Sequence, residues 1–263
     1  MEFKICIIPQ KVYLSMVFDS KLLMEEIKNR YSFHVSYSYR TISLYTLTKY
    51  NRKNCYNCKP NHRIRLNKVS ICYNPTIKKF CYHALHKNIY VIDTILRLVS
   101  TLILLFHNGI LLHAAGVVKD NKKCILFVGE TNSGKSTLAK NFSNKRVLSD
   151  EVCPLIFFND KLYSWRSMFY SEVVPVYSKL SLVEIDKIIF LRKFDDINNN
   201  GKLLRLFYED KFVLLLKNTL WFTKDHSLTK LLIDLIVKIA GVDTIGYFEA
   251  NMLKHFWTLY DKI

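Results

Sequence analysis

The chain has 263 residues and carries 39 Lys and Arg residues against 22 Asp and Glu residues, a formal net charge of +17. Half of the residues are hydrophobic, so a sizeable core is expected and an intrinsically disordered chain is excluded. The charge would attract a nucleotide, an acidic peptide, nucleic acid or an anionic membrane. The lysines are scattered rather than gathered in a basic block, so nucleic-acid binding is not favoured.

The seven cysteines and the most apolar stretch of the chain both bear on its compartment. An odd number of cysteines favours a reducing cytoplasm over a disulfide framework. Glu2 and Lys4 precede only a short apolar run, so we expect no signal peptide.

Residues 90–106 are about long enough to span a bilayer, but they include Asp93 and Arg97, which can pair on one helix face. We therefore expect a buried or amphipathic helix there and no membrane span.

Residues 1–84 are predicted to form a small sheet-rich unit without a catalytic motif. Apolar runs and period-two alternation mark its strands, and a capped segment marks one helix. The first two strands should pair as a hairpin. The expected strands are 3–8, 12–18, 32–39, 41–48 and one or two within 63–72, and the expected helix is 20–29.

Cys55 and Cys58 form the one C-x-x-C pair of this unit. With Cys72, Cys81 and His83 they could supply the four ligands of a zinc ion. The second pair of cysteines lacks the usual tight spacing, and small core residues would explain the same positions. Both interpretations stay open at this point, and a redox C-x-x-C is less favoured because no βαβ pattern frames it.

The second predicted domain, residues 85–263, begins with a helix over 85–107. A strand over 110–118, a short polar turn and a strand over 124–128 follow. Strands joined by such a turn should be antiparallel neighbours. An ordinary doubly wound nucleotide-binding domain begins at the strand before its phosphate loop and uses parallel crossovers, so this domain is expected to differ from it.

Residues 129–136 read Gly-Glu-Thr-Asn-Ser-Gly-Lys-Ser and match G-x-x-x-x-G-K-[ST], the phosphate-binding loop (P-loop) of NTPases. The loop stands between the strand 124–128 and a helix over 137–142, which is the context that the motif requires. The glycines let the backbone approach a phosphate, and successive N–H groups form an anion nest, helped by the helix behind it. Lys135 would meet the β- and γ-phosphates, and the Ser136 hydroxyl suits Mg²⁺. The predicted nucleotide-binding residues are Gly129, Glu130, Thr131, Asn132, Ser133, Gly134, Lys135, Ser136 and Thr137, with ATP as the expected nucleotide and GTP as the alternative.

Asp150 and Glu151 lie at the end of a short predicted strand over 146–148, soon after the P-loop helix. One carboxylate can bind Mg²⁺ and the other can accept a proton from a hydroxyl nucleophile. A solvated acidic turn is the alternative. Beyond the pair, the expected elements are a hairpin of strands 152–158 and 161–164, a strand over 188–191, a polar loop 195–202, helices 203–216 and 227–240, a strand 244–249 and a last helix 252–260.

The strand with Leu112-His113-Ala114, the P-loop and the sequence Ser149-Asp150-Glu151 together resemble the catalytic domain of HPr kinase/phosphorylase and its smaller relatives, which include kinases encoded beside modified-peptide pathways. The resemblance is sharp over residues 110–155, weak up to residue 250 and absent from the first hundred residues. It implies an α/β fold, with a phosphoenolpyruvate-carboxykinase-like P-loop kinase core and a mixed sheet, preceded by the small sheet-rich N-terminal unit.

The resemblance also implies roles for single residues. Ser136 and Asp150 would hold Mg²⁺, and Glu151 would be the base that acts on a serine hydroxyl, with the roles of the two carboxylates open to exchange. His113 would lie near the phosphates; a core histidine is the alternative. The longer family signature that follows the acidic pair and helps to recognise HPr is not evident, so neither HPr as the acceptor nor the reverse phosphorolysis is expected. Arg166 and Arg192 are candidate phosphate clamps.

The function expected from the sequence is a Mg²⁺-ATP-dependent kinase that transfers the γ-phosphate to a Ser or Thr hydroxyl of a peptide or small protein. Its predicted catalytic residues are Glu151, Asp150, His113 and Lys135. The alternatives are a nucleotide-binding regulatory or scaffold module without turnover, a small-metabolite kinase and a nucleic-acid-dependent ATPase. The expected partners are the peptide or small-protein acceptor and a second copy of the chain in a homo-oligomer.

Overall fold

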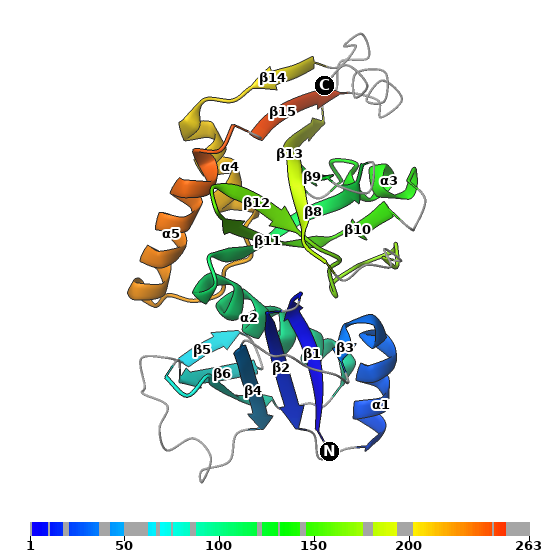
Figure 1. The fold of residues 1–263 in the computed structure, drawn as a ribbon, viewed down its shortest axis with the longest axis vertical. Helices are drawn as coiled ribbons and strands as arrows, with labels where there is room; N and C mark the ends of the chain where they lie inside the picture. Colours follow the sequence, from blue (N-terminus) through cyan, green and yellow to red (C-terminus); the bar gives the residue numbers. More distant parts are fainter. Residues whose placement is uncertain are drawn as a thin grey trace. The chain divides into compact units, whose positions relative to one another are not determined.

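The structure is a computed structural model that describes residues 2–9, 11–17, 21–36, 43–49, 63–66, 69–74, 76–84, 88–119, 123–130, 132–142, 146–175, 181–193, 202–243 and 245–250. They form two compact units, each built on one mixed sheet (Figure 1). Unit 1 contains Met1–His107 and Trp221–Leu231, and unit 2 contains Asn108–Leu220 and Leu232–Ile263. The chain is therefore an α/β protein with two mixed sheets.

Unit 1 holds a seven-stranded sheet in the order β3-β1-β2-β4-β7-β6-β5. β2, β4 and β7 run parallel to one another, and the other neighbours pair antiparallel, including the predicted β1–β2 hairpin. The predicted strand 32–39 is wrong in part, because Ser32–His34 form a 3₁₀ turn and residues 37–42 lie outside the described part. The strands are β1 (Glu2–Ile8), β2 (Val12–Val17), β3 (Val35–Ser36), β4 (Ser43–Lys49), β5 (Arg63–Leu66), β6 (Val69–Asn74) and β7 (Lys79–Ala84), and α1 is Lys21–Arg30.

The long apolar helix α2 (Ile89–Phe106) belongs to the core of unit 1 and contacts β1, β6 and β7. Asn88 begins it, because the Asn88 side chain accepts a hydrogen bond from the Val91 N–H at 3.0 Å. Of the described helices, α2 is the one long and apolar enough to cross a membrane, and 61% of its residues are buried in the structure. The sequence placed a domain boundary at residue 84, ahead of this helix. The first segment of unit 1 instead ends after this helix, at His107. A compact packing unit does not by itself define a domain, so the domains 1–84 and 85–263 stay predictions.

Unit 2 holds an eight-stranded sheet in the order β10-β8-β11-β12-β13-β15-β14, with β9 paired to both β8 and β13. β8 and β9 are antiparallel, as the short turn between them predicted, whereas β13 runs parallel to β9 and to β15. The strands are β8 (Gly109–Val118), β9 (Lys123–Val128), β10 (Val147–Ser149), β11 (Val152–Phe158), β12 (Lys161–Ser164), β13 (Val183–Lys193), β14 (Lys202–Arg205) and β15 (Ile245–Ala250), and the helices are α3 (Lys135–Lys140) and α4 (Tyr208–Asn218). The helix α5 (His226–Ala240) begins in the unit 1 segment Trp221–Leu231 and continues into unit 2 from Leu232.

The predicted helix over residues 203–216 is wrong at its start. Lys202–Arg205 form the strand β14, which pairs antiparallel with β15, and α4 begins only at Tyr208. The apolar residues of this segment suit a strand as well as a helix, so the partner strand decides between them. The predicted hairpin of β11 and β12 is confirmed, with Asn159 and Asp160 in the left-handed region at its turn. The predicted helix 252–260 lies outside the described residues.

Candidate nucleotide-binding site

The P-loop joins the end of β9 to the start of α3. Gly134 lies in the left-handed region with φ 93°, where a side chain is disfavoured, and Asn132 does so with φ 66°. The Ser133 N–H donates to the Glu130 carbonyl oxygen at 3.1 Å and closes a tight turn. Thr131 lies outside the described residues. The strand, glycine-containing turn and helix expected from the motif are therefore present.

Gly129 lies where the loop passes the end of β13. A Cβ atom at this position would lie 2.5 Å from Ser133 Oγ and 2.8 Å from the backbone oxygen of Leu191. Both distances are shorter than real Cβ contacts, so the loop requires glycine here. The same closeness buries Ser133 Oγ, which has no hydrogen-bond partner among the described residues.

Lys135 folds back onto its own loop. Its ammonium donates to the carbonyl oxygens of Gly129 at 2.7 Å and Glu130 at 2.8 Å. The residue is only 6% exposed, and burial lowers the pKa of its ammonium. Within the described part of the chain no carboxylate pairs with it, so a buried cation has neutral partners alone. Two of its three N–H donors are used, and one remains for a ligand.

Ser136 brings the acidic pair to the P-loop. Its half-buried hydroxyl donates to the backbone oxygen of Asp150 at 3.4 Å. The register supports this placement, because Ser149 pairs with Gly116 and Val152 with His113 along the same edge of β8. Residues 150 and 151 thus form the link between β10 and β11, directly beside the start of α3.

Asp150 is 1% exposed, and its carboxylate accepts three backbone hydrogen bonds. Oδ1 accepts from the N–H of Ser171 at 2.9 Å, and Oδ2 accepts from the N–H groups of Glu172 at 2.8 Å and Val173 at 3.0 Å. A carboxylate offers about four lone-pair positions, so three donors leave it little room for another partner. Asp150 therefore anchors the segment 171–173.

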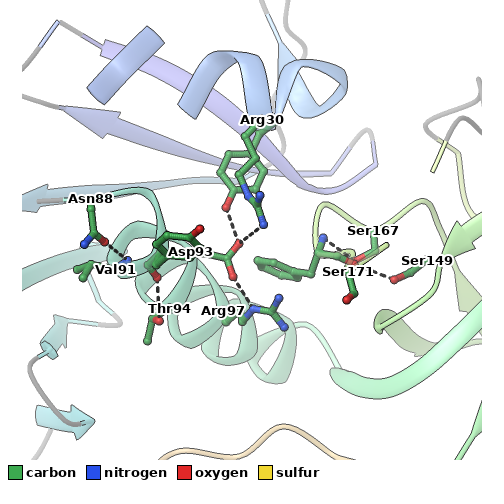
Figure 2. A network of polar contacts seen from close by, with 12 residues as sticks. Arg30, Asn88, Val91, Asp93, Thr94, Arg97, Ser149, Ser167 and Ser171 are labelled. Atoms are coloured by element: carbon green, nitrogen blue, oxygen red, sulfur yellow. Dashed lines mark hydrogen bonds and ion pairs between the residues drawn. The ribbon is translucent and has the colours of Figure 1, made fainter. Parts of the chain in front are cut away.

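Ser149 fixes the residues just before this segment. Its hydroxyl donates to the Phe169 carbonyl at 2.8 Å, and its oxygen accepts from the N–H groups of Glu151 and Val152, each at 3.0 Å. Ser167 also accepts from the Phe169 N–H at 3.0 Å (Figure 2). Sequence reasoning missed the role of residues 167–173, because most of their hydrogen bonds to the acidic pair and to Ser149 come from backbone groups, which any residue type has.

Glu151 follows Asp150 and has a half-exposed side chain. Its backbone is held at both ends, because its N–H donates to Ser149 Oγ and its carbonyl accepts from the Ala114 N–H at 3.0 Å. Glu172, on the anchored segment, forms an ion pair with Lys140 at the end of α3. The segment 171–173 is thus tied to the acidic pair and to the P-loop helix.

His113 is half-buried on β8, opposite Val152 of β11. Side chains alternate along a strand, so His113 shares a face with Ala115 and Val117. These two residues pack in one core cluster with Leu138 of α3, which places His113 on the face of the sheet that α3 covers.

The two candidate phosphate clamps differ in what the structure describes. Arg166 is buried, and desolvation lowers the pKa of its guanidinium to about 10, against a smaller opposing effect of Tyr170. The side chain of Arg192 lies outside the described part, although its backbone is part of β13. The clamp role of both arginines stays a prediction.

The cysteines of unit 1 do not gather around a metal in the part of the chain that the structure describes. Cys72 and Cys81 pair across β6 and β7, and Cys81 is buried in the sheet. No group of three or more His, Cys, Asp or Glu side chains among the described residues could hold a metal ion. Cys55 and Cys58 lie outside those residues, so the zinc hypothesis stays a prediction for them.

Among solved structures, the chain is similar to the HPr(Ser) kinase/phosphatase from Coxiella burnetii. The sequence identity is 20%, the match covers 48% of this chain and 93% of that chain, and the TM-score is 0.24. No protein-family model and no curated protein matches the chain.

Proposed function

We propose that unit 2 binds a nucleoside triphosphate in the P-loop and transfers its γ-phosphate to a hydroxyl of a peptide or small protein. The observation that carries this proposal is the contact of the Ser136 hydroxyl with the backbone oxygen of Asp150, which brings the backbone of the acidic pair beside the start of the P-loop helix. Phosphoryl transfer needs this combination, because the reaction depends on positioning and on the neutralisation of charge. The proposed core is a phosphoenolpyruvate-carboxykinase-like P-loop kinase core related to HPr kinases.

The residues present fit a triphosphate group. Lys135 is a buried cation without an anionic partner among the described residues, and a phosphate would supply that partner. Ser133 Oγ is buried without a hydrogen bond in the described part, and it lies inside the same loop. Gly129 leaves no space for a side chain, so the loop can pass close to Ser133 and to the backbone of Leu191.

In the proposed mechanism the chain acts mainly by position and charge. The N–H groups of the P-loop and the Lys135 ammonium would hold the β- and γ-phosphates, and Lys135 would exchange a loop carbonyl for a phosphate oxygen. Ser136 and one carboxylate of Asp150 and Glu151 would hold Mg²⁺, which when bound neutralises charge on the phosphate oxygens. The other carboxylate would accept the proton of the acceptor hydroxyl. His113 lies on the P-loop face of the sheet, where it could orient a phosphate oxygen.

The acceptor is proposed from the family resemblance and from charge. A Ser or Thr hydroxyl on a peptide or small protein is the acceptor that the resemblance implies. The net charge of +17 would favour an acidic acceptor, because opposite charges speed and strengthen encounter. ATP is the proposed phosphate donor, with GTP as the alternative.

Mass spectrometry of a reaction mixture tests this function. The protein is incubated with Mg²⁺-ATP and with peptides and small proteins encoded beside its gene. We expect one acceptor to gain about 80 Da, the mass of a phosphoryl group. Lys135→Ala should abolish the product, whereas Lys140→Ala, a change of an exposed lysine on the same helix, should retain it. A product that survives in Lys135→Ala would contradict the proposal.

A nucleotide-binding regulatory module without turnover is the second candidate. The observation that favours it is the carboxylate of Asp150, which three backbone N–H groups already occupy. This candidate predicts tight nucleotide binding in the same mixture, with no phosphorylated product and no consumption of ATP.

A further inference from the structure

Asp150 and Glu151 are neighbours in sequence, but the structure holds their carboxylates differently. Asp150 is buried and accepts from three consecutive backbone N–H groups, those of Ser171, Glu172 and Val173. Glu151 has a half-exposed side chain on a backbone that Ser149 and Ala114 hold in place. Backbone donors cannot rotate away as a side chain can, so a change of partner by Asp150 would leave these N–H groups unpaired unless the segment 171–173 moves.

Several contacts oppose such a movement. Val173 packs in the core cluster with Leu138 and Ala139 of α3. If the segment moved, the buried Val173 N–H would lose its hydrogen bond to the Asp150 carboxylate. A buried N–H without a partner is strongly disfavoured. Ser149 also holds Phe169 just before the segment, because its hydroxyl donates to the Phe169 carbonyl. The segment 171–173 is therefore more stable on Asp150 than away from it.

We propose that Asp150 is a positioning residue and that Glu151 is the carboxylate that meets the Mg²⁺-nucleotide. Asp150 keeps the segment 171–173 in place during binding and fixes the backbone of the acidic pair beside Ser136. Glu151 reaches the cation from that fixed backbone. This inference rests on the proposed function, and it gives the Mg²⁺ role to Glu151 and a positioning role to Asp150 in place of the exchangeable roles of metal ligand and base.

Two isosteric variants separate the roles, Asp150→Asn and Glu151→Gln, with Glu172→Gln as the matched control. The asparagine amide would turn N–H donors toward the backbone N–H groups that now meet a carboxylate. The control removes an exposed carboxylate that pairs with an exposed lysine, and such pairs contribute little. The first measurement is hydrogen exchange of the amides of residues 171–173 in the nucleotide-free protein. The second is the affinity for a fluorescent ATP analogue with and without Mg²⁺.

We expect Asp150→Asn to speed the exchange of these amides by about tenfold or more, since hydrogen bonds to a charged group are lost. The same variant should keep the gain in nucleotide affinity that Mg²⁺ gives the unmodified protein. Glu151→Gln should leave the exchange unchanged and lose about tenfold or more of that gain. Glu172→Gln should retain both.

The opposite results would overturn the inference. Unchanged exchange in Asp150→Asn would refute the positioning role, and loss of the Mg²⁺ gain in that variant would make Asp150 a metal ligand. A Mg²⁺ gain that survives in Glu151→Gln would refute the role of Glu151. An unmodified protein that binds no nucleotide would contradict the proposed function and with it the role of Glu151, while the exchange measurement would still decide the role of Asp150.

Discussion

Asp93 of unit 1 and Asp150 of unit 2 are largely buried carboxylates, and their hydrogen-bond partners differ in charge. In unit 1, Asp93 of α2 accepts from the Tyr31 hydroxyl at 2.6 Å and from Arg97 Nε at 2.7 Å, and Arg30 lies 3.6 Å away (Figure 2). In unit 2, the partners of the Asp150 carboxylate among the described residues are three backbone N–H groups. The buried ammonium of Lys135, also in unit 2, has two carbonyl oxygens as its partners in the described part of the chain.

The Asp93 cluster of unit 1 contains its own counterions. In unit 2, by contrast, Lys135 has no anionic partner among the described residues. Opposite charges compensate one another around Asp93, as is usual for buried ionic groups. In unit 2, Lys135 and Asp150 do not pair with each other among the described contacts, so neither neutralises the other. A site that binds a phosphate needs such an uncompensated cation, because the ligand brings the missing charge.

The first prediction removes the charge compensation of unit 1. Asp93→Asn should lower the free energy of unfolding by about 2–3 kcal/mol, because two arginines lose their anion in a poorly solvated place. Urea unfolding measures the change. Glu25→Gln, at an exposed position on α1, is the control and should cost less than about 0.5 kcal/mol. Equal stability of the two variants would show that the Asp93 cluster is not a stabilising element.

The second prediction concerns the shape of the P-loop. Gly129→Ala should cost about 1–3 kcal/mol, because its Cβ would lie 2.5 Å from Ser133 Oγ and 2.8 Å from the Leu191 backbone oxygen. Gly241→Ala is a fitting control in the same unit, since its nearest atom, the Lys238 oxygen, would lie at 3.4 Å. Thermal unfolding compares the two. If Gly129→Ala were as stable as the control, the close approach of the loop to β13 would be wrong.

The third prediction uses pH to probe the Asp93 cluster. Burial, followed by the charge of Asp93, raises the pKa of Tyr31 well above its ordinary value of 10.0. The folded state therefore keeps a proton that the unfolded chain releases, so this stabilisation is complete below pH 10 and is lost as the pH rises above it. Tyr31→Phe should make stability fall less steeply between pH 9 and 11.5, roughly the range around that pKa. An unchanged slope would contradict the buried Tyr31–Asp93 hydrogen bond.

The fourth prediction, which has the smallest expected effect, concerns the buried ammonium of Lys135. Lys135→Met should leave the stability of the nucleotide-free protein unchanged or raise it by about 1 kcal/mol at most, because a buried charge without a counterion is replaced by an apolar chain of similar length. Unfolding in urea without nucleotide measures it. A loss clearly above about 1 kcal/mol would mean that Lys135 serves the fold rather than a ligand.

Sequence reasoning succeeded where a signal is local. The antiparallel β8 and β9, the turn between β11 and β12 and the pairing of Asp93 with Arg97 each follow from residues close together in the chain. The link of Asp150 to residues 171–173 could not be predicted, because its donors are backbone groups twenty-one or more residues away. β14 was missed for a related reason, since its partner β15 lies far along the chain.

The central claim is that Lys135 and the P-loop bind the β- and γ-phosphates of a nucleotide. Titration of the protein with ATP and with AMP, which lacks both phosphates, tests it most directly. We predict that the unmodified protein binds ATP about 100-fold or more tightly than AMP, and that Lys135→Ala removes most of this preference. Equal affinity for ATP and AMP, or a preference that Lys135→Ala retains, would contradict the account.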